Sequence, residues 1–181
     1  MLDNINRVLF LDRDGVINKR LIDEYVTTVE EFEFLPGVLE AISKLNSSFS
    51  RIFIVTNQQG IAKGLMTEVD LSEIHLNMLQ QIAANGGKVD AVFYCPHMRN
   101  EGCDCRKPKI GMYEQALGSF PDIKNKVLYM VGDTSSDMLF AKNIGAVAVM
   151  INDVSVIDEG NYKFVFSSLK QFAKDIHLVL T

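Results

Sequence analysis

The sequence is poor in the residues and segments that mark secreted and membrane-bound proteins. It has no tryptophan, four prolines and three cysteines in 181 residues. An odd number of cysteines fits a framework of paired disulfides poorly. No segment reaches the ~18 uncharged apolar residues of a membrane span, and the N-terminus lacks the basic segment and long apolar run of a signal peptide. These absences predict a cytoplasmic protein that does not use a membrane as a partner.

Charge and length set further limits. The formal net charge is −5 at pH 7, which argues against nucleic acid as the main partner because binding to a phosphate backbone normally needs a basic face. With 48% hydrophobic residues, the chain is long enough for one full core and short for two. We therefore expect a single domain over residues 1–181, stable as a monomer or weak homodimer, with a small molecule as its ligand.

Five apolar runs alternate with helical patterns or loops along the chain. Such alternation is typical of the α/β class, in which a parallel sheet lies between layers of helices. Ligands of such sheets bind beyond the carboxyl ends of the strands. The expected strands are Val8–Leu11, Ile52–Val55, Ala91–Tyr94, Val127–Val131 and Ala146–Ile151. Helices are expected over residues 35–45, 67–82, 136–144 and 168–180.

The first apolar run ends in two carboxylates, Asp12 and Asp14. If the turn keeps an extended geometry, both side chains point roughly the same way, so that one could attack while the other handles protons. Gly15 then allows a sharp turn. Acidic turns after strands also occur in proteins without such chemistry, so the interpretation depends on the residues at the ends of the other strands.

Polar and acidic residues come after the other strands as well. Thr56 ends the second run and offers a hydroxyl to phosphate oxygens. Asp133 comes after the fourth run and could hold Mg²⁺ together with Asp12, because this ion takes oxygen ligands. Arg106 and Lys107, just past the third run, supply cations for a phosphoryl group and for substrate. Each feature alone fits ordinary loop polarity, but their combination favours phosphoryl transfer.

This combination resembles the motifs of the haloacid dehalogenase superfamily across essentially the whole chain. The four motifs stand here as Asp12-Arg13-Asp14-Gly15, Thr56, Lys107, and Gly132-Asp133 with Asp137. The resemblance implies a Rossmann-like fold without a large cap domain, in which Asp12 attacks phosphorus and forms an aspartyl-phosphate. Asp14 would protonate the leaving oxygen and then activate water. It also implies Mg²⁺ ligands at Asp12, Asp14 and Asp133, with Asp137 supporting them.

All three cysteines lie within residues 95–105. Together with one histidine they form a set of three thiolates and an imidazole, which is a pattern of structural zinc sites. We expect Zn²⁺ to hold this loop and thereby to fix Arg106 and Lys107, which come directly after it. His75 and His177 lie in expected helices without nearby ligand types and are interpreted as ordinary core or surface residues. The expected zinc ligands are Cys95, His97, Cys103 and Cys105.

The cysteine loop followed by Arg-Lys-Pro resembles one branch of the superfamily, which contains the D,D-heptose 1,7-bisphosphate phosphatases and the histidinol-phosphatase domains. Segments 12–18 and 56–64 resemble the heptose enzymes. In contrast, only five residues separate His97 from Cys103, a short loop similar to the histidinol type. Histidinol phosphatases place an Asp where this chain has Gln59, and a neutral amide suits sugar hydroxyls better than a charged amine.

The resemblance thus implies an Mg²⁺-dependent phosphatase that removes the 7-phosphate of heptose 1,7-bisphosphate during nucleotide-heptose synthesis. Histidinol phosphatase is the close alternative. A regulator that binds sugar phosphates without turnover is an alternative of another class, although the pairing of Asp12 with Asp14 argues against it. A polynucleotide end-phosphatase is disfavoured by the acidic charge. Lys19 and Lys63 are expected to be solvated. The implied substrate contacts are Arg13, Asp23, Glu24, Tyr25, Asn57, Gln58, Gln59, Arg106 and Thr134.

Overall fold

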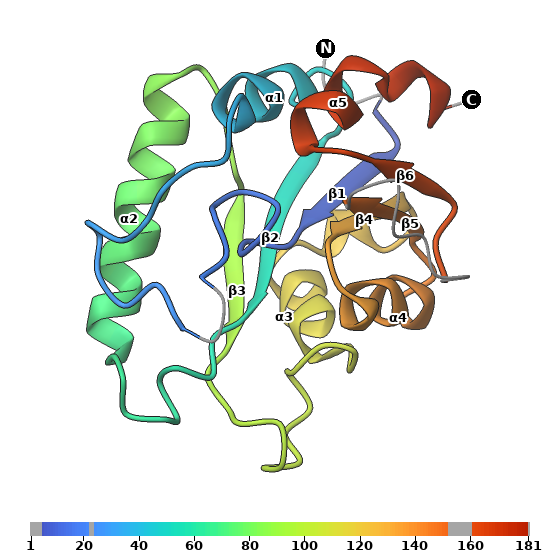
Figure 1. Cartoon of the computed structure of the whole chain (residues 1–181). Coiled ribbons are helices and arrows are strands. Elements are labelled where there is room, and N and C mark those ends of the chain that lie inside the picture. The colour runs from blue at the N-terminus through green and yellow to red at the C-terminus, as the bar shows by residue number, and fades with distance from the viewer. Residues whose placement is uncertain (1–4, 22–23, 152–160, 181) are drawn as a thin grey trace.

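The computed structural model describes residues 5–21, 24–151 and 161–180. Its six strands pair in parallel in the order β3-β2-β1-β4-β5-β6 (Figure 1). The predicted α/β class with a parallel sheet is therefore confirmed. The strands are β1 (Arg7–Leu11), β2 (Arg51–Asn57), β3 (Ala91–Cys95), β4 (Val127–Gly132), β5 (Val147–Ile151) and β6 (Phe164–Phe166).

Helices cover both faces of the sheet (Figure 1). α1 (Val38–Leu45), α2 (Glu68–Ala84) and α5 (Leu169–Lys174) bury their apolar sides in one core cluster. α3 (Gly111–Ser119) and α4 (Ser135–Asn143) bury theirs in a second cluster on the opposite face. Two hydrophobic cores therefore enclose the sheet, which explains why its central strands are apolar on both sides.

The alternation of side chains along β1 connects the two cores. Leu9 and Leu11 belong to the cluster under α1, α2 and α5, whereas Val8 and Phe10 belong to the cluster under α3 and α4. All four side chains are fully buried. Successive residues of a strand point to opposite faces, so β1 is held rigidly from both sides up to the residue before Asp12.

The structure differs from the sequence prediction in four elements. α3, β6 and a 3₁₀ helix over Pro121–Ile123 were not predicted: α3 is short and begins at a glycine, and the other two have three residues each, so none carries a strong periodic pattern. The single helix expected over 168–180 is wrong, because α5 ends at Lys174 and a separate 3₁₀ helix covers Ile176–Leu178. Asp175 lies between them with φ −102° and ψ 20°, outside the α-helical range, so the regular helix ends there.

The sheet order reverses between β1 and β4, which are neighbours although they are far apart in the sequence. In open α/β sheets, the ligand crevice lies at such a reversal, beyond the carboxyl ends of the strands. The fold therefore predicts that the residues after β1 and β4 form the ligand site. Among the helices of the described segments, none has the length and apolar character needed to cross a membrane.

Candidate active site

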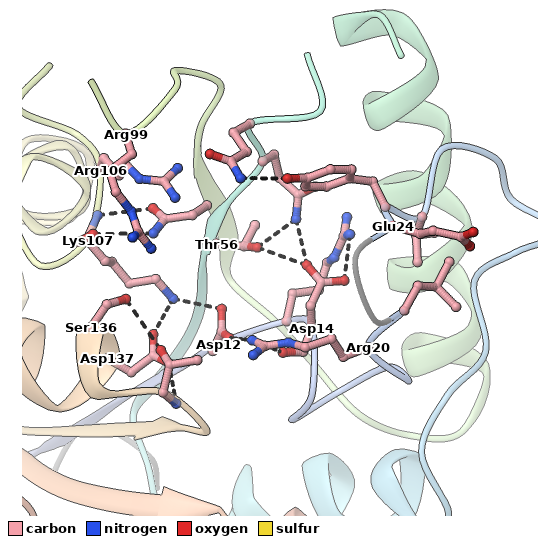
Figure 2. A pocket seen from close by; sticks show the side chains of 18 of the residues that line it. Asp12, Asp14, Arg20, Glu24, Thr56, Arg99, Arg106, Lys107, Ser136 and Asp137 are labelled. Carbon is pink, nitrogen blue, oxygen red and sulfur yellow. Dashed lines mark hydrogen bonds and ion pairs between the residues drawn. The ribbon is translucent and has the colours of Figure 1, made fainter. Parts of the chain in front are cut away.

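A pocket of about 690 Å³ opens at the carboxyl ends of β1, β2 and β4 (Figure 2). It brings together most residues singled out in the sequence and adds Arg20 and Arg99, which were not. Asp23 lies outside the described residues. The predicted residues that line the pocket are Asp12, Arg13, Asp14, Glu24, Tyr25, Thr56, Asn57, Gln58, Gln59, Arg106, Lys107, Thr134 and Asp137.

Asp12 and Lys107 form a buried ion pair at the base of this pocket. Lys107 Nζ lies 2.7 Å from Asp12 Oδ1 and 2.6 Å from Asp137 Oδ1, and it donates to the carbonyl oxygen of Val55 at 2.7 Å (Figure 2). Burial alone would lower the pKa of Lys107, but the two carboxylates raise it above its ordinary value. Lys107 therefore stays charged and holds one oxygen of Asp12 in place.

The carboxylates around Asp12 carry more negative charge than Lys107 neutralises. Burial, followed by the charge of Asp137, raises the pKa of Asp12 to about 6. Burial and the charge of Asp12 raise the pKa of Asp133 to about 8. Side-chain oxygens of all three aspartates lie within 4.8 Å of one another. Such a cluster of oxygen donors suits a hard divalent cation.

Arg20 shows where positive charge is favoured in this cluster. One of its guanidinium nitrogens, Nη2, lies 2.8 Å from the backbone oxygen of Asp14, 2.9 Å from Asp133 Oδ1 and 3.7 Å from Asp12 Oδ2. These three oxygens converge on one point, so the donor set fits a cation. Asp14 contributes its carbonyl oxygen there, whereas its carboxylate points elsewhere.

The Asp14 carboxylate accepts hydrogen bonds on both oxygens. Oδ1 accepts from Arg13 Nη2 at 2.9 Å and from Asn18 Nδ2 at 3.0 Å. Oδ2 accepts from Gln58 Nε2 at 2.8 Å and faces the Thr56 hydroxyl at 3.5 Å. Burial acts to raise the pKa of Asp14, but these donors, with Arg13 the strongest, hold it below its ordinary value. Asp14 is therefore an ionised group in a fixed orientation beside Asp12.

Glycine allows the two acidic turns to approach one another. Gly15 has a φ of 96°, and a Cβ atom there would lie 2.0 Å from Asp133 Oδ2. At Gly132 a Cβ atom would lie 2.2 Å from the Cβ of Asp137. Asp137 also caps α4, because its Oδ2 accepts from the backbone and hydroxyl of Thr134. Thr134 and Asp137 thus order the turn that carries Asp133.

Asn57 and Arg106 tie the loop after β3 to the pocket. Asn57 accepts from the backbone nitrogen of Lys107 at 3.0 Å and donates to its carbonyl oxygen at 3.3 Å. Arg106 Nη1 donates to the carbonyl oxygen of His97 at 3.2 Å. The polar atoms of Asn57 therefore bind the Lys107 backbone, which gives this predicted substrate contact a positioning role.

The four predicted zinc ligands lie together in the loop after β3. Cys95 Sγ is 3.0 Å from Cys105 Sγ and 3.5 Å from Cys103 Sγ, and His97 Nδ1 is 3.2 Å from Cys105 Sγ. All three cysteines are free thiols. A tetrahedral zinc site with Zn–S bonds of about 2.3 Å needs sulfur atoms about 3.8 Å apart. The two sulfur–sulfur distances here are shorter than that, and the four donors, gathered within 4.8 Å of one another, are of the type that a closed tetrahedral metal site uses.

The opposite wall of the pocket is built around Tyr25. Its hydroxyl accepts from Gln59 Nε2 at 2.5 Å and from Lys63 Nζ at 3.0 Å. Lys63 also lies over the Tyr25 ring at 4.9 Å. Lys63 lines the pocket, so its expected role as a purely solvated residue does not describe its contacts. Arg99 and Arg106 lie on one side of the pocket, near Lys107 (Figure 2).

Three residues near the site were not predicted from the sequence. Arg20 and Arg99 stand in irregular loops without a motif, and only their nearness to Asp14 and Arg106 in the sequence could have suggested them. His75 was interpreted as an ordinary helix residue, yet its side chain is buried against Arg13, with Nε2 3.2 Å from Nη1. A helical pattern predicts that His75 faces inward and says nothing of this partner.

Three features of this site together define a class of enzyme. They are the aspartate pair after the central strand, the buried lysine bonded to the first aspartate, and the acidic cation site after β4. Haloacid dehalogenase-type phosphatases have these features and the same fold. The chain is thus a phosphoric monoester hydrolase, and comparisons with known proteins narrow the class to a family.

The sequence matches a family and several curated relatives. The family model described as polynucleotide kinase 3 phosphatase matches residues 7–179. A D-glycero-alpha-D-manno-heptose-1,7-bisphosphate 7-phosphatase of Mycobacterium tuberculosis is 40% identical over 168 residues, 91% of this chain and 88% of the relative. The D-glycero-beta-D-manno-heptose-1,7-bisphosphate 7-phosphatase of Pseudomonas putida is 39% identical over 145 residues, 80% of this chain and 82% of the relative.

Solved structures agree with this result. The D,D-heptose 1,7-bisphosphate phosphatase of B. bronchiseptica, complexed with magnesium and phosphate, superimposes with a TM-score of 0.85 at 33% identity. The match covers 96% of this chain and 99% of that one. The chain belongs to the polynucleotide kinase 3 phosphatase family, among relatives named as heptose-bisphosphate 7-phosphatases. The predicted membership of the haloacid dehalogenase class and its heptose branch is confirmed.

Proposed function

We propose that this chain hydrolyses D-glycero-D-manno-heptose 1,7-bisphosphate to the heptose 1-phosphate through a phosphorylated Asp12. The observation that carries the proposal is the pairing at the base of the pocket. Asp12 is bonded to a positively charged Lys107, whose pKa lies above its ordinary value, and the ionised Asp14 lies beside it. The identity of the substrate is inferred from relatives at about 40% identity that are named for this reaction.

In the first step, a carboxylate oxygen of Asp12 attacks the phosphorus of the 7-phosphate. The bond between phosphorus and the sugar oxygen breaks, and Asp14 gives a proton to that oxygen. The phosphate brings negative charge beside Asp14, which raises its pKa and allows it to hold this proton. Lys107 and the Thr56 hydroxyl face the reacting groups and stabilise the charge that develops there.

In the second step, water replaces the sugar. Asp14, now ionised, takes a proton from the water, whose oxygen bonds to phosphorus while the bond to Asp12 breaks. Inorganic phosphate leaves and Asp12 is regenerated. The same carboxylate thus acts as acid and then as base, which splits one difficult hydrolysis into two easier displacements.

Two metals belong to the proposal. The carboxylates of Asp12 and Asp133 and the carbonyl oxygen of Asp14 would hold Mg²⁺, as the convergence of these oxygens on Arg20 supports. When bound, Mg²⁺ neutralises charge on the transferring phosphoryl group. Cys95, His97, Cys103 and Cys105 would hold a structural Zn²⁺. This zinc would order the loop that carries Arg99 and Arg106.

The shape and charge of the pocket support a sugar bisphosphate. Its volume of about 690 Å³ lies within the range of roughly 300–1,000 Å³ usual for small-molecule sites. Arg99 and Arg106 offer cations for the second phosphate, and Gln59 and Tyr25 offer neutral hydrogen-bonding groups for hydroxyls. Relatives named for the α anomer match 91% of this chain and the Pseudomonas putida relative named for the β anomer 80%, so we propose the α anomer.

The proposal is tested by kcat/KM values measured with Mg²⁺ on one preparation. The substrates are both anomers of the heptose bisphosphate, histidinol phosphate and an oligonucleotide with a 3′-phosphate. We expect the α-heptose bisphosphate to exceed histidinol phosphate and the oligonucleotide by at least ~100-fold, equal to ~2.7 kcal/mol of transition-state binding. A preference for histidinol phosphate would show that the short cysteine loop indicates the substrate better than Gln59 does.

We further propose that the protein acts in the cytoplasm as a monomer or weak homodimer, without nucleic acid or a membrane as a partner. The net charge of −5 supports this because a nucleic-acid partner would favour a basic face. Size-exclusion chromatography over a concentration series tests the oligomeric state. Retention on DNA resin at physiological salt would contradict the proposed absence of nucleic acid.

A further inference from the structure

His75 is a buried polar side chain that the proposed chemistry does not use. It projects from α2 and is 7% exposed, and its ring meets Tyr94 edge to face at 6.0 Å between centroids. Its Nε2 lies 3.2 Å from Nη1 of Arg13. Burial, followed by the charge of Arg13, lowers the pKa of His75 to about 3. The imidazole is therefore neutral, and its Nε2 accepts a hydrogen bond from the guanidinium.

Arg13 in turn holds Asp14 by a single nitrogen. The Arg13 side chain is 1% exposed, with Nη2 donating to Asp14 Oδ1 at 2.9 Å and Nη1 directed to His75. Among the described residues, its Nε has no hydrogen-bond partner. A guanidinium next to a carboxylate ordinarily binds both oxygens in a fork. Here His75 binds Nη1, one of the two nitrogens that could complete the fork, and thereby fixes the rotation of the guanidinium beside Asp14.

Because Arg13 binds only Oδ1 of Asp14, the second oxygen is free to contact other groups. Oδ2 is bound by Gln58 and faces Thr56, the hydroxyl expected beside the phosphoryl group. A two-point contact with Arg13 would turn the carboxylate and draw Oδ2 toward the guanidinium. Catalytic groups need an orientation accurate to a fraction of an ångström, so this rotation would slow both proton transfers.

We propose that His75 and Arg13 are positioning residues that orient Asp14 for its acid and base steps, His75 by accepting one Arg13 nitrogen. This inference rests on the proposed function and deepens it. His75 does not touch substrate in this scheme. Its removal therefore changes the rate of the chemical steps and leaves substrate binding nearly unaltered.

The test compares His75→Leu with His75→Gln. Leucine fills the same buried space without an acceptor, whereas the glutamine carbonyl can replace Nε2. We expect His75→Leu to lower kcat by about tenfold, the effect of leaving one buried charged donor without its acceptor, with KM within about twofold. His75→Gln should restore kcat to within about threefold. Met78→Leu, a buried change on the same helix, should leave kcat unchanged.

These assays use the heptose bisphosphate as substrate if the wild type hydrolyses it. If it does not, they use an alkyl phosphate ester that the wild type hydrolyses. If His75→Leu does not fold, His75→Asn replaces it, because its shorter side chain keeps an amide that cannot reach Arg13. A wild-type kcat in the variant tested would overturn the inference while the proposed function stands. A fall in kcat that also remains in His75→Gln would overturn it in the same way. A wild type that hydrolyses no phosphate ester would overturn both.

Discussion

At the scale of single residues, the balance of charge around Asp12 determines what the site can do. Lys107 uses its three donors on Asp12, Asp137 and the Val55 carbonyl, so it is saturated before substrate arrives. The remaining negative charge of Asp12 and Asp133 is met by Arg20. The site thus combines two cations of different kinds: Lys107, which is buried and held by three contacts, and Arg20, which is partly exposed and can be displaced.

Replacing Asp12 by asparagine tests the nucleophile. The asparagine side chain would still accept from Lys107 but could not attack phosphorus, so we expect turnover to fall by at least ~10³-fold with the fold preserved. Activity and far-UV circular dichroism of Asp12→Asn measure the two effects. Asp122→Asn, a change in a partly exposed ion pair with Arg51, is the matched control. Appreciable turnover by Asp12→Asn would remove Asp12 as the nucleophile.

Arg20→Gln tests the exchangeable cation. Arg20 Nη2 contacts the same oxygens that would hold Mg²⁺, so the metal has to displace it. Loss of this competing charge should tighten Mg²⁺ binding by about threefold to tenfold, as expected for a partly exposed ion pair of about 1 kcal/mol. Titration calorimetry on magnesium-free protein measures the Kd. An unchanged or weaker Kd in Arg20→Gln would show that Arg20 does not compete.

At the scale of elements, the sequence predicted what strong periodicity determines and missed what depends on tertiary contact. Five strands and most helices agree with the apolar runs, and the residues after β1 and β4 agree with the rule that sites lie at strand ends. Arg20 and His75 reach the site from a loop and from a helix face, so no local pattern marks them. α3 is short and begins at a glycine, so its sequence lacks a clear period.

The loop between β3 and α3 joins the cysteine cluster to the pocket. Arg106 donates to the carbonyl oxygen of His97, whereas Lys107 is held independently by Asn57. We expect protein purified without chelator to contain about one equivalent of zinc, and Cys103→Ser to lose most of it. Because Arg106 depends on the loop more than Lys107 does, this variant should raise KM for the bisphosphate more than it lowers kcat.

Metal analysis and steady-state kinetics on the same samples check this prediction. Ser72→Ala, on the exposed side of α2, provides a control for purification. Less than about half an equivalent of zinc in the wild type would count against the structural metal. A large fall in kcat without a change in KM would instead indicate that Lys107 depends on the cysteine loop.

At the scale of the whole molecule, one sheet and its two covering cores connect the site residues. β1 and β4 meet at the centre of the sheet, and helices from both halves of the chain pack on the same face as α1. We therefore propose that residues 1–181 form a single domain. The catalytic geometry then depends on the stability of the whole sheet.

Buried His75 gives that stability a dependence on pH. Its pKa is about 3 in the folded state against an ordinary 6.5, so the unfolded state binds a proton that the folded state excludes. His75 by itself should therefore lower the free energy of unfolding as the pH drops from about 6.5 toward 3, by about 2 kcal/mol at pH 5. Asp12 and Asp133, whose pKa values are raised, act in the opposite direction over the same range in both proteins. Urea unfolding at pH 7 and pH 5 should therefore show a change that is about 2 kcal/mol less favourable in the wild type than in His75→Gln. Equal changes in the two proteins would show that His75 does not carry the effect.

In the proposed mechanism, Asp12 carries the phosphoryl group and Asp14 activates the water that removes it. Asp14→Asn, incubated with an aryl phosphate whose leaving group needs no proton, should form the intermediate and hydrolyse it slowly. Mass spectrometry of acid-quenched protein measures this directly. We expect one phosphate on the peptide that contains Asp12, and none on Asp12→Asn. An enzyme that turns over without phosphate on that peptide, or with phosphate on another residue, would contradict it.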